Sequence, residues 1–188
     1  MHRQVEQFLG LVNYHRAFIK GYAGMAGPLY QVTGKRPFVW QAEQEAAFGQ
    51  VKTALLSAPL LALPTKQDPF ILDTDPSETA IGAELIQVQG GVERVIAYGS
   101  LSLTPEQRRY CVTRRELLAI VKFTRQYRHY LLGRRFTVRT DHNSLTWLLH
   151  FKEPQGQLAR WLEKLSQYQM TLQFRKGRQH ANADALSR

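Results

Sequence analysis

The order of strand and helix patterns after Pro69 constrains the fold more than any other feature of this sequence. Short runs rich in β-branched and apolar residues follow one another closely, and Gly90-Gly91 is typical of a hairpin turn. Helix-like and strand-like segments then alternate to the end of the chain. This order predicts an α/β fold, with a five-stranded mixed sheet flanked by helices.

The expected elements of this part can be placed individually. Thr104-Pro105 favours a helix start, and apolar residues at helical spacing predict a long helix from Thr113 to Leu132 that Gly133 ends. We expect strands at 70–75, 80–88, 93–100, 136–140 and 170–174, and shorter helices at 144–149, 158–167 and 183–186.

The first part of the chain predicts a small, mainly helical segment in front of the sheet. Apolar residues recur at helical spacing over 5–19 and again over 46–55. Glycine and proline residues between 21 and 37 predict loops between these helices. We therefore expect two units, residues 1–68 and residues 69–188.

Composition limits the partners of such a chain. It has 25 Lys+Arg against 15 Asp+Glu, a formal net charge of +10, and 44% hydrophobic residues. The hydrophobic content predicts an ordinary globular core, and the positive excess indicates a polyanionic partner, most commonly nucleic acid. Basicity alone does not say whether the protein binds, cuts or coats that partner.

Cysteine content and hydropathy exclude several other classes. The single cysteine, Cys111, excludes a disulfide framework and a cysteine-rich zinc site, and is typical of an intracellular protein. No apolar run approaches the roughly 18 residues that span a bilayer. The first residues lack the apolar region of a signal peptide. We expect a protein that is not secreted and has no membrane partner.

Four acidic residues lie within or next to elements that should build the core: Asp75, Glu116, Asp141 and Asp184. Unpaired buried carboxylates are costly, so several of them together require cations, protons or a metal. If strand ends and helix starts converge, these oxygens form the ligand set that Mg²⁺ or Mn²⁺ prefers. Two such ions would suit hydrolysis of a phosphodiester.

Each carboxylate also has a simpler interpretation. Glu116 stands three residues after Thr113, which is the spacing of a capping box. Asp75 could begin a turn, Asp141 could cap the helix that follows it, and Asp184 could interact with a helix dipole. Asp73, on the same side of its strand as Asp75, is the chief rival ligand.

Ordered motifs at these residues make the sequence resemble the reverse transcriptase polyprotein of gypsy-type LTR retroelements, from the thumb and connection to the RNase H domain. Residues 8–19 are similar to the helix after the palm of these enzymes, and Trp40 with the residues after it to the connecting segment. The remaining motifs are Thr74-Asp75-Pro76-Ser77, Tyr98-Gly99-Ser100, Arg115-Glu116-Leu117-Leu118, Arg139-Thr140-Asp141-His142 and Asn182-Ala183-Asp184-Ala185.

The resemblance implies an RNase H-like fold over residues 69–188 and hydrolysis of the RNA strand of RNA/DNA hybrids. Two Mg²⁺ ions, which Mn²⁺ could replace, would be held by the four acids, and the products would carry 3′-hydroxyl and 5′-phosphate ends. It also implies contacts with the fingers and palm of the reverse transcriptase, which this chain lacks together with any Tyr-X-Asp-Asp motif. The expected location is the cytoplasm or a virus-like particle.

Substrate contacts are expected at residues close to the four acids in sequence. Thr113 and His142 are placed to touch the hybrid backbone, although each could instead cap a helix. His180 could help the product to leave, but its spacing from Asp184 differs from that of the mobile histidine in some RNases H. Ser77, beside the first motif, completes the set of expected contacts: Ser77, Thr113, His142 and His180.

A second hypothesis is a catalytically silent module, decayed or domesticated, that binds nucleic acid or acts as a scaffold with the same fold. The presence of all four acids argues against decay. Arginines around the long helix could contact phosphates without sequence preference, or could simply form a solvated face.

Overall fold

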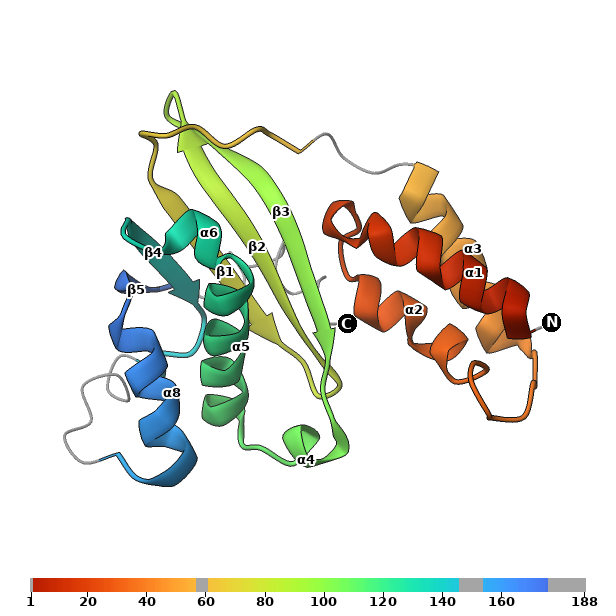
Figure 1. The fold of residues 1–188 in the computed structure, drawn as a ribbon. Helices are drawn as coiled ribbons and strands as arrows, with labels where there is room; N and C mark the ends of the chain where they lie inside the picture. Colours follow the sequence, from red (N-terminus) through yellow and green to blue (C-terminus); the bar gives the residue numbers. More distant parts are fainter. Residues whose placement is uncertain (1, 57–60, 146–153, 176–188) are drawn as a thin grey trace.

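The computed structural model describes residues 2–56, 61–145 and 154–175 (Figure 1). Asp184, His180 and the helix expected at 183–186 lie outside these ranges, as does most of the helix expected at 144–149. The helices are α1 (His2–Tyr14), the 3-10 turn η1 (Arg16–Phe18), α2 (Tyr22–Tyr30), α3 (Ala42–Leu56), α4 (Pro105–Arg108), α5 (Val112–Gln126), α6 (Arg128–Leu131) and α8 (Gly156–Ser166). The strands are β1 (Phe70–Pro76), β2 (Ala80–Gln89), β3 (Val92–Ser102), β4 (Arg135–Thr140) and β5 (Gln169–Phe174).

The five strands form one mixed sheet, as the sequence predicts, and the structure adds their order, β3-β2-β1-β4-β5. β1 pairs antiparallel with β2 and parallel with β4, and β4 pairs parallel with β5. Gly90 and Gly91, with φ of 60° and 80°, make the hairpin turn between β2 and β3. Because β1 and β4 are parallel neighbours, their carboxyl ends lie at the same edge of the sheet.

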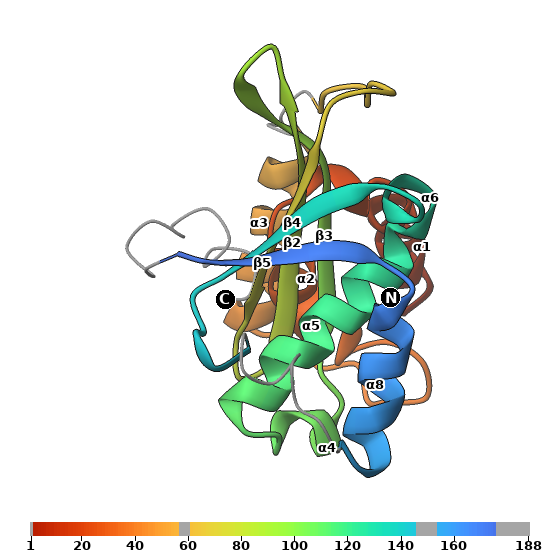
Figure 2. The same ribbon diagram turned by 90° about the vertical axis from the view of Figure 1, so that its left-hand side faces the viewer.

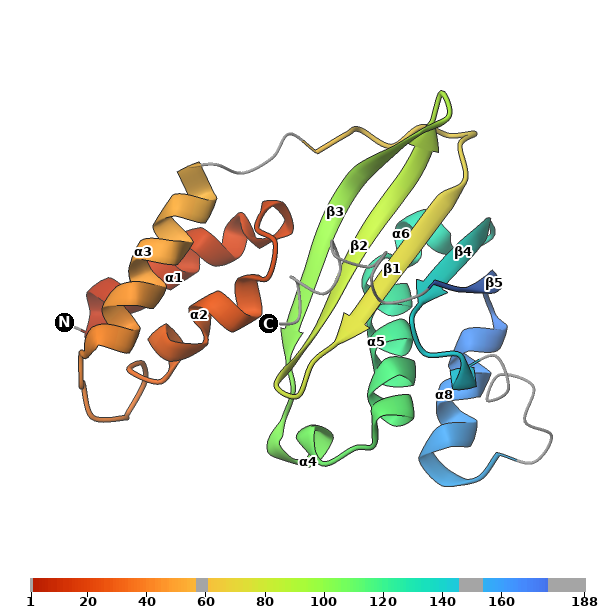
Figure 3. The ribbon, with the colours of Figure 1, turned by 180° about the vertical axis from the view of Figure 1, so that it is seen from behind.

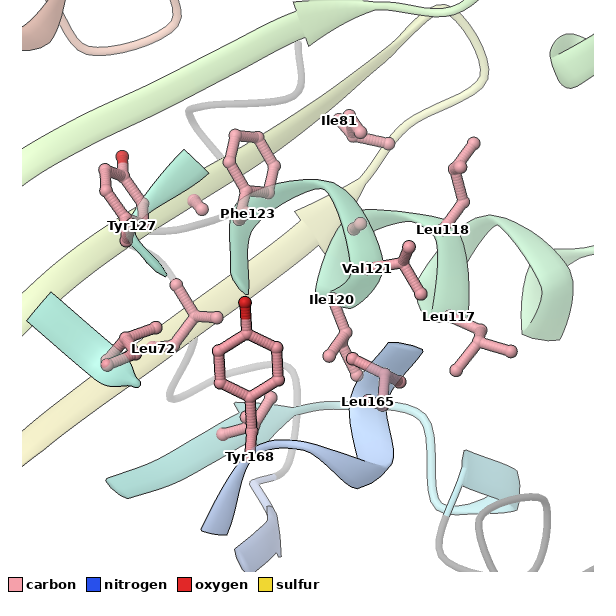
Figure 4. Packing of buried hydrophobic residues seen from close by; sticks show 14 of the residues in the cluster. Leu72, Ile81, Leu117, Leu118, Ile120, Val121, Phe123, Tyr127, Leu165 and Tyr168 are labelled. Carbon is pink, nitrogen blue, oxygen red and sulfur yellow. The ribbon is translucent and has the colours of Figure 1, made fainter. Parts of the chain in front are cut away.

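The main hydrophobic core lies between the sheet and α5. α5 packs against β1 and β2, and α8 packs against α5. Leu72 of β1, Ile120 and Phe123 of α5, and Leu165 of α8 belong to this cluster together with Tyr168 (Figure 4). The apolar face of α5 therefore ties both helices to the centre of the sheet.

Close packing also explains a glycine in β3. A Cβ atom on Gly99 would lie 2.5 Å from Cε1 of Phe123 and 2.6 Å from the hydroxyl of Tyr127. No side chain fits there without moving these two rings. Gly99 thus allows α5 to approach β3.

The long helix predicted from Thr113 to Leu132 is interrupted. α5 ends at Gln126, Tyr127 has non-helical dihedral angles, and α6 is a separate short turn. The predicted end is correct, because Gly133 has a φ of 77°, in the left-handed region that favours glycine.

The first unit has its own hydrophobic cluster, which includes Val12, Leu29 and Val51. The prediction of loops between its first and last helices is wrong for 22–30, because α2 runs through Gly24, Gly27 and Pro28. Tyr22, Ala26 and Leu29 are buried on one side of α2. Burial of these side chains outweighs the poor helix propensity of glycine and proline.

The helical unit lies beside β3, at the edge of the sheet away from β5 and α8 (Figures 1 and 2). η1 and α2 contact β3, and Figure 3 shows them from behind. The described contacts between the units include polar ones: the Ala23 amide donates to Ser100 Oγ at 3.1 Å, and Lys20 Nζ lies 3.2 Å from Glu84 Oε1. The boundary predicted at residues 68/69 stays a prediction.

No helix within the described ranges is long and apolar enough to cross a membrane.

Candidate active site

Glu116 lies in the first half of α5, on the side that faces the sheet. Only 3% of the residue is exposed. Its Oε2 accepts a hydrogen bond from Thr140 Oγ1 of β4 at 3.2 Å. The helix therefore brings a carboxylate to the end of a core strand and buries it there.

The surroundings of Glu116 make its negative charge unfavourable. Burial, and then the charges of Asp141 and Asp75, raise the pKa of Glu116 to about 8. The Thr140 hydrogen bond and Arg115 oppose this shift without cancelling it. The three acids are therefore close enough to repel one another, which is an environment that favours binding of a cation.

The strand pairing explains how Asp75 and Asp141 come close to each other. Asp73 of β1 pairs in register with Arg139 of β4. Asp75 and Asp141 each stand two residues further along the chain, Asp75 still within β1 and Asp141 directly after β4, at the same edge of the sheet. Asp75 is partly buried and Asp141 is exposed, so the group opens toward solvent.

The described residues do not contain a complete ligand set for a single ion. Within 2–56, 61–145 and 154–175 no group of three or more His, Cys, Asp or Glu side chains could hold a metal ion. Asp184, the fourth expected ligand, lies outside those ranges. Asp75, Glu116 and Asp141 are thus neighbours that interact electrostatically, and their role as metal ligands stays a prediction.

The capping-box interpretation of Glu116 is wrong. α5 begins at Val112 after Cys111, so Thr113 is inside the helix and not at its N-cap. Thr113 Oγ1 instead lies 2.8 Å from His142 Nε2. The contact joins the start of α5 to the loop after β4 and fixes His142 beside Asp141.

Ser77 organises the turn after β1. Its hydroxyl donates to the Ala80 carbonyl oxygen at 3.0 Å and accepts from the Ala80 amide at 3.0 Å. Arg115 Nη1 donates to the Ser77 carbonyl oxygen at 2.9 Å, so α5 holds this turn as well. A role of Ser77 in substrate binding stays a prediction, as do those of Thr113 and His142. His180 lies outside the described residues.

Thr140 is a residue that the sequence analysis missed. Its hydroxyl donates to Glu116 and accepts from the His142 amide at 3.1 Å. It therefore orients two of the expected site residues. The sequence did contain a sign of this role. Thr140 stands two residues after the buried Val138, so both side chains lie on the face of β4 that is turned toward α5.

Asp73, the rival ligand, is occupied by an ion pair within the sheet. Arg139 donates Nε to Asp73 Oδ1 and Nη2 to Asp73 Oδ2, the latter at 2.7 Å. Arg139 Nη1 also lies 2.7 Å from Glu93 Oε1. Although burial lowers the pKa of Arg139, its hydrogen bonds to Asp73 and Glu93 raise it further, so the cation is permanent. Asp73 is a structural carboxylate.

The model of the family described as "RNase H-like domain found in reverse transcriptase" matches residues 65–168. The chain is 40% identical over 188 residues to the retrovirus-related Pol polyprotein from transposon 297 of Drosophila melanogaster, which covers 99% of this chain and 17% of the polyprotein. It is 36% identical over 183 residues to that from transposon 412 of the same organism, covering 97% of this chain and 15% of the polyprotein.

A solved structure of a foamy viral protease-reverse transcriptase in complex with an RNA/DNA hybrid has the same fold. The TM-score is 0.77 at 20% identity, over 93% of this chain and 25% of that one. The predicted RNase H-like fold is thus confirmed, and the chain is similar to a small part of much longer polyproteins. With its sheet, its helices and more than half of its sequence matched, this chain belongs to the family of RNase H-like domains found in reverse transcriptases.

Proposed function

We propose that this chain is the ribonuclease H of a gypsy-type LTR retroelement and hydrolyses the RNA strand of RNA/DNA hybrids. Its products would carry 3′-hydroxyl and 5′-phosphate ends. The family supports a hydrolase of this kind, and a foamy viral relative binds an RNA/DNA hybrid. In this proposal the chain works beside the fingers and palm of a longer polyprotein, in the cytoplasm or in virus-like particles.

The observation that carries the proposal is the environment of Glu116. A buried carboxylate with a pKa near 8 has two further carboxylates, Asp75 and Asp141, as its electrostatic neighbours. A structural role would be expected to come with a neutralising cation, as it does for Asp73. Perturbed titratable groups at the edge of a sheet are typical of catalytic sites.

The oxygen-only donor set fits divalent ions such as Mg²⁺ or Mn²⁺. Asp75, Glu116, Asp141 and Asp184 would together hold the two ions. Bound there, the ions would supply an activated water and charge stabilisation at the leaving oxygen. Thr140 holds the Glu116 carboxylate at the end of β4 through its hydrogen bond.

Recognition of the hybrid would rely on backbone contacts. The chain carries a net charge of +10, which favours binding to phosphates without sequence preference. Choice of the RNA strand would then come from groove shape and 2′-hydroxyls. Thr113 and His142, joined at 2.8 Å beside Asp141, are the proposed contacts nearest the site.

A cleavage assay tests the proposal. The wild-type chain, incubated with a 5′-labelled RNA/DNA hybrid and Mg²⁺ or Mn²⁺, should cut the RNA strand and leave 3′-hydroxyl ends. Asp141→Asn should reduce cleavage to background without loss of folding, because it removes one proposed ligand and little volume. Glu163→Gln, at an exposed acid of α8, is the matched control and should cut like the wild type.

The alternative is a silent module that only binds nucleic acid. It predicts that wild type and Asp141→Asn are equally inactive with either metal while both bind the hybrid. That result, with correctly folded protein, would exclude the nuclease and leave the binding module.

A further inference from the structure

A cationic groove lies between α5 and α8, outside the candidate active site. It has a volume of about 480 Å³, and the buried edges of Trp161 and Tyr168 belong to its lining. Four cations surround it: Lys122, Arg125, Arg128 and Lys164. None of the described side chains that line the groove is acidic.

The cations of this groove are not neutralised by the described protein. None of the four takes part in an ion pair within residues 2–56, 61–145 and 154–175. Arg128 donates to the side-chain oxygen of Gln167, which lines the same groove. A helix C-terminus favours one nearby cation, which accounts for Arg125 and Lys164 singly but not for four around one hollow.

The groove faces away from the carboxylates. Arg125 follows Glu116 by about two and a half helical turns, so it projects from the opposite side of α5. Glu116 points toward the sheet and Thr140, whereas the groove is lined from α8 as well. Figure 2 shows α5 and α8 side by side. A hybrid held at the carboxylates would therefore leave this groove accessible.

We propose that the groove between α5 and α8 binds the phosphodiester backbone of a single-stranded nucleic acid segment, separately from the hybrid. Charge complementarity indicates phosphate groups as the ligand, because four cations around one groove, unpaired within the described residues, favour a polyanion. Lys122 and Arg125 stand three residues apart in α5, about 4.5 Å of helical rise, and Arg128 follows in α6. All three line the groove, so a strand can contact them in turn.

The shape of the groove favours one strand over a duplex. The groove encloses about 480 Å³ between two helices that pack against each other, which is too small for a duplex to enter but leaves room for a single flexible backbone. Trp161 and Tyr168 are 8% and 9% exposed, so they cannot stack on bases. Binding should therefore depend steeply on salt and little on base sequence.

Fluorescence anisotropy with a labelled 12-nucleotide single-stranded DNA of mixed sequence tests this site, with EDTA present so that no cleavage occurs. Lys122→Glu/Lys164→Glu should weaken binding at low salt by about tenfold or more, and should lower the salt slope by about 0.7 for each lost phosphate contact. Lys35→Glu/Lys52→Glu, with the same charge change on the helical unit, should weaken binding less than about twofold. The measurement does not depend on nuclease activity.

Three results would overturn the proposal. The first is an equal loss in both double variants, which would mean that only net charge matters. The second is an equal loss of single-strand and hybrid binding in Lys122→Glu/Lys164→Glu, which would place the groove on the hybrid path. The third is displacement of the oligonucleotide by inorganic triphosphate at an equal concentration of phosphate groups, which would make the groove a site for a compact anion.

Discussion

Two buried carboxylates in neighbouring parts of the same α/β unit, Asp73 and Glu116, have different charged surroundings. In the middle of β1, Asp73 is buried and both its oxygens accept hydrogen bonds from Arg139. Near the carboxyl ends of β1 and β4, Glu116 is equally buried, but the charges of Asp141 and Asp75 act on its pKa more strongly than that of Arg115. The first carboxylate has a guanidinium as its direct partner, whereas the second has like charges around it.

The difference separates structural from functional acids more clearly than burial does. Asp73 is 4% exposed and Glu116 is 3% exposed. What distinguishes them is the partner, a fixed guanidinium in one case and like charges in the other. A cation is built into the protein at Asp73, and must come from outside at Glu116. The predictions below test this contrast.

The largest effect is expected when Arg139 is replaced. Arg139→Met would leave Asp73 buried without its cation, which costs about 3–5 kcal/mol in the free energy of unfolding. Urea denaturation at neutral pH measures this loss. The double variant Asp73→Leu/Arg139→Met, which removes both charges, should recover most of it. A double variant as unstable as Arg139→Met would contradict the account of Asp73.

The opposite effect is expected at Glu116. Its folded-state pKa, about 8, lies above the ordinary value of 4.5. The folded protein therefore holds the proton more tightly, and the wild type loses stability as the pH rises from about 4.5 to about 8. Glu116→Gln avoids this loss and should be more stable than the wild type by a few kcal/mol at pH 9 in EDTA, with little difference at pH 4.

Urea titrations over this pH range measure the effect, with Glu163→Gln as a control that should follow the wild type. Equal pH profiles of wild type and Glu116→Gln would mean that neither burial nor the neighbouring carboxylates raise the pKa of Glu116.

Divalent ions should stabilise the carboxylates around Glu116 and should have no effect at Asp73. Millimolar Mg²⁺ or Mn²⁺ should raise the melting temperature of the wild type. The corresponding gain in the free energy of unfolding is about 1–3 kcal/mol at ion concentrations well above Kd. Asp141→Asn should lose most of this shift. Arg139→Met should retain it despite its lower starting stability, because Asp73 is not a ligand. A shift that Asp141→Asn keeps in full would place the ions elsewhere.

Much of the fold was predictable because its signals are local. The hairpin between β2 and β3 follows from Gly90-Gly91, and the end of α6 from Gly133. The helix α2 was not predictable, since the burial of Ala26 and Leu29 depends on a core shared with α3. The low helix propensity of Gly24 and Gly27 predicts a loop at these residues.

The candidate site was predictable in part. The positions of Asp75, Glu116 and Asp141 at element ends and starts led to the expectation that they meet, and the mutual influence on Glu116 agrees with it. The role of Asp73 required its partner in β4, sixty-six residues away in sequence. No local pattern reveals that pairing, because strand register decides it.

The smallest effect is expected at a third buried acid, Glu84 of β2, which the helical unit neutralises. Glu84 is 2% exposed, and burial raises its pKa while Lys20 lowers it. The Lys20 side chain is 32% exposed, so water screens part of the pair. Lys20→Met should therefore cost about 1–2 kcal/mol at neutral pH, between the values for exposed and buried pairs.

The cost of Lys20→Met should shrink on acidification, because a protonated Glu84 needs no cation. A double-mutant cycle with Glu84→Gln measures the pair directly: in that background Lys20→Met should have almost no effect, and Lys52→Met serves as the exposed control. Since Lys20 belongs to the helical unit and Glu84 to the sheet, this coupling energy also measures how firmly the two units are joined. A coupling energy of zero would leave the units held together by their uncharged contacts alone, and would make Asp73 the one buried acid whose neutralisation stabilises the described structure.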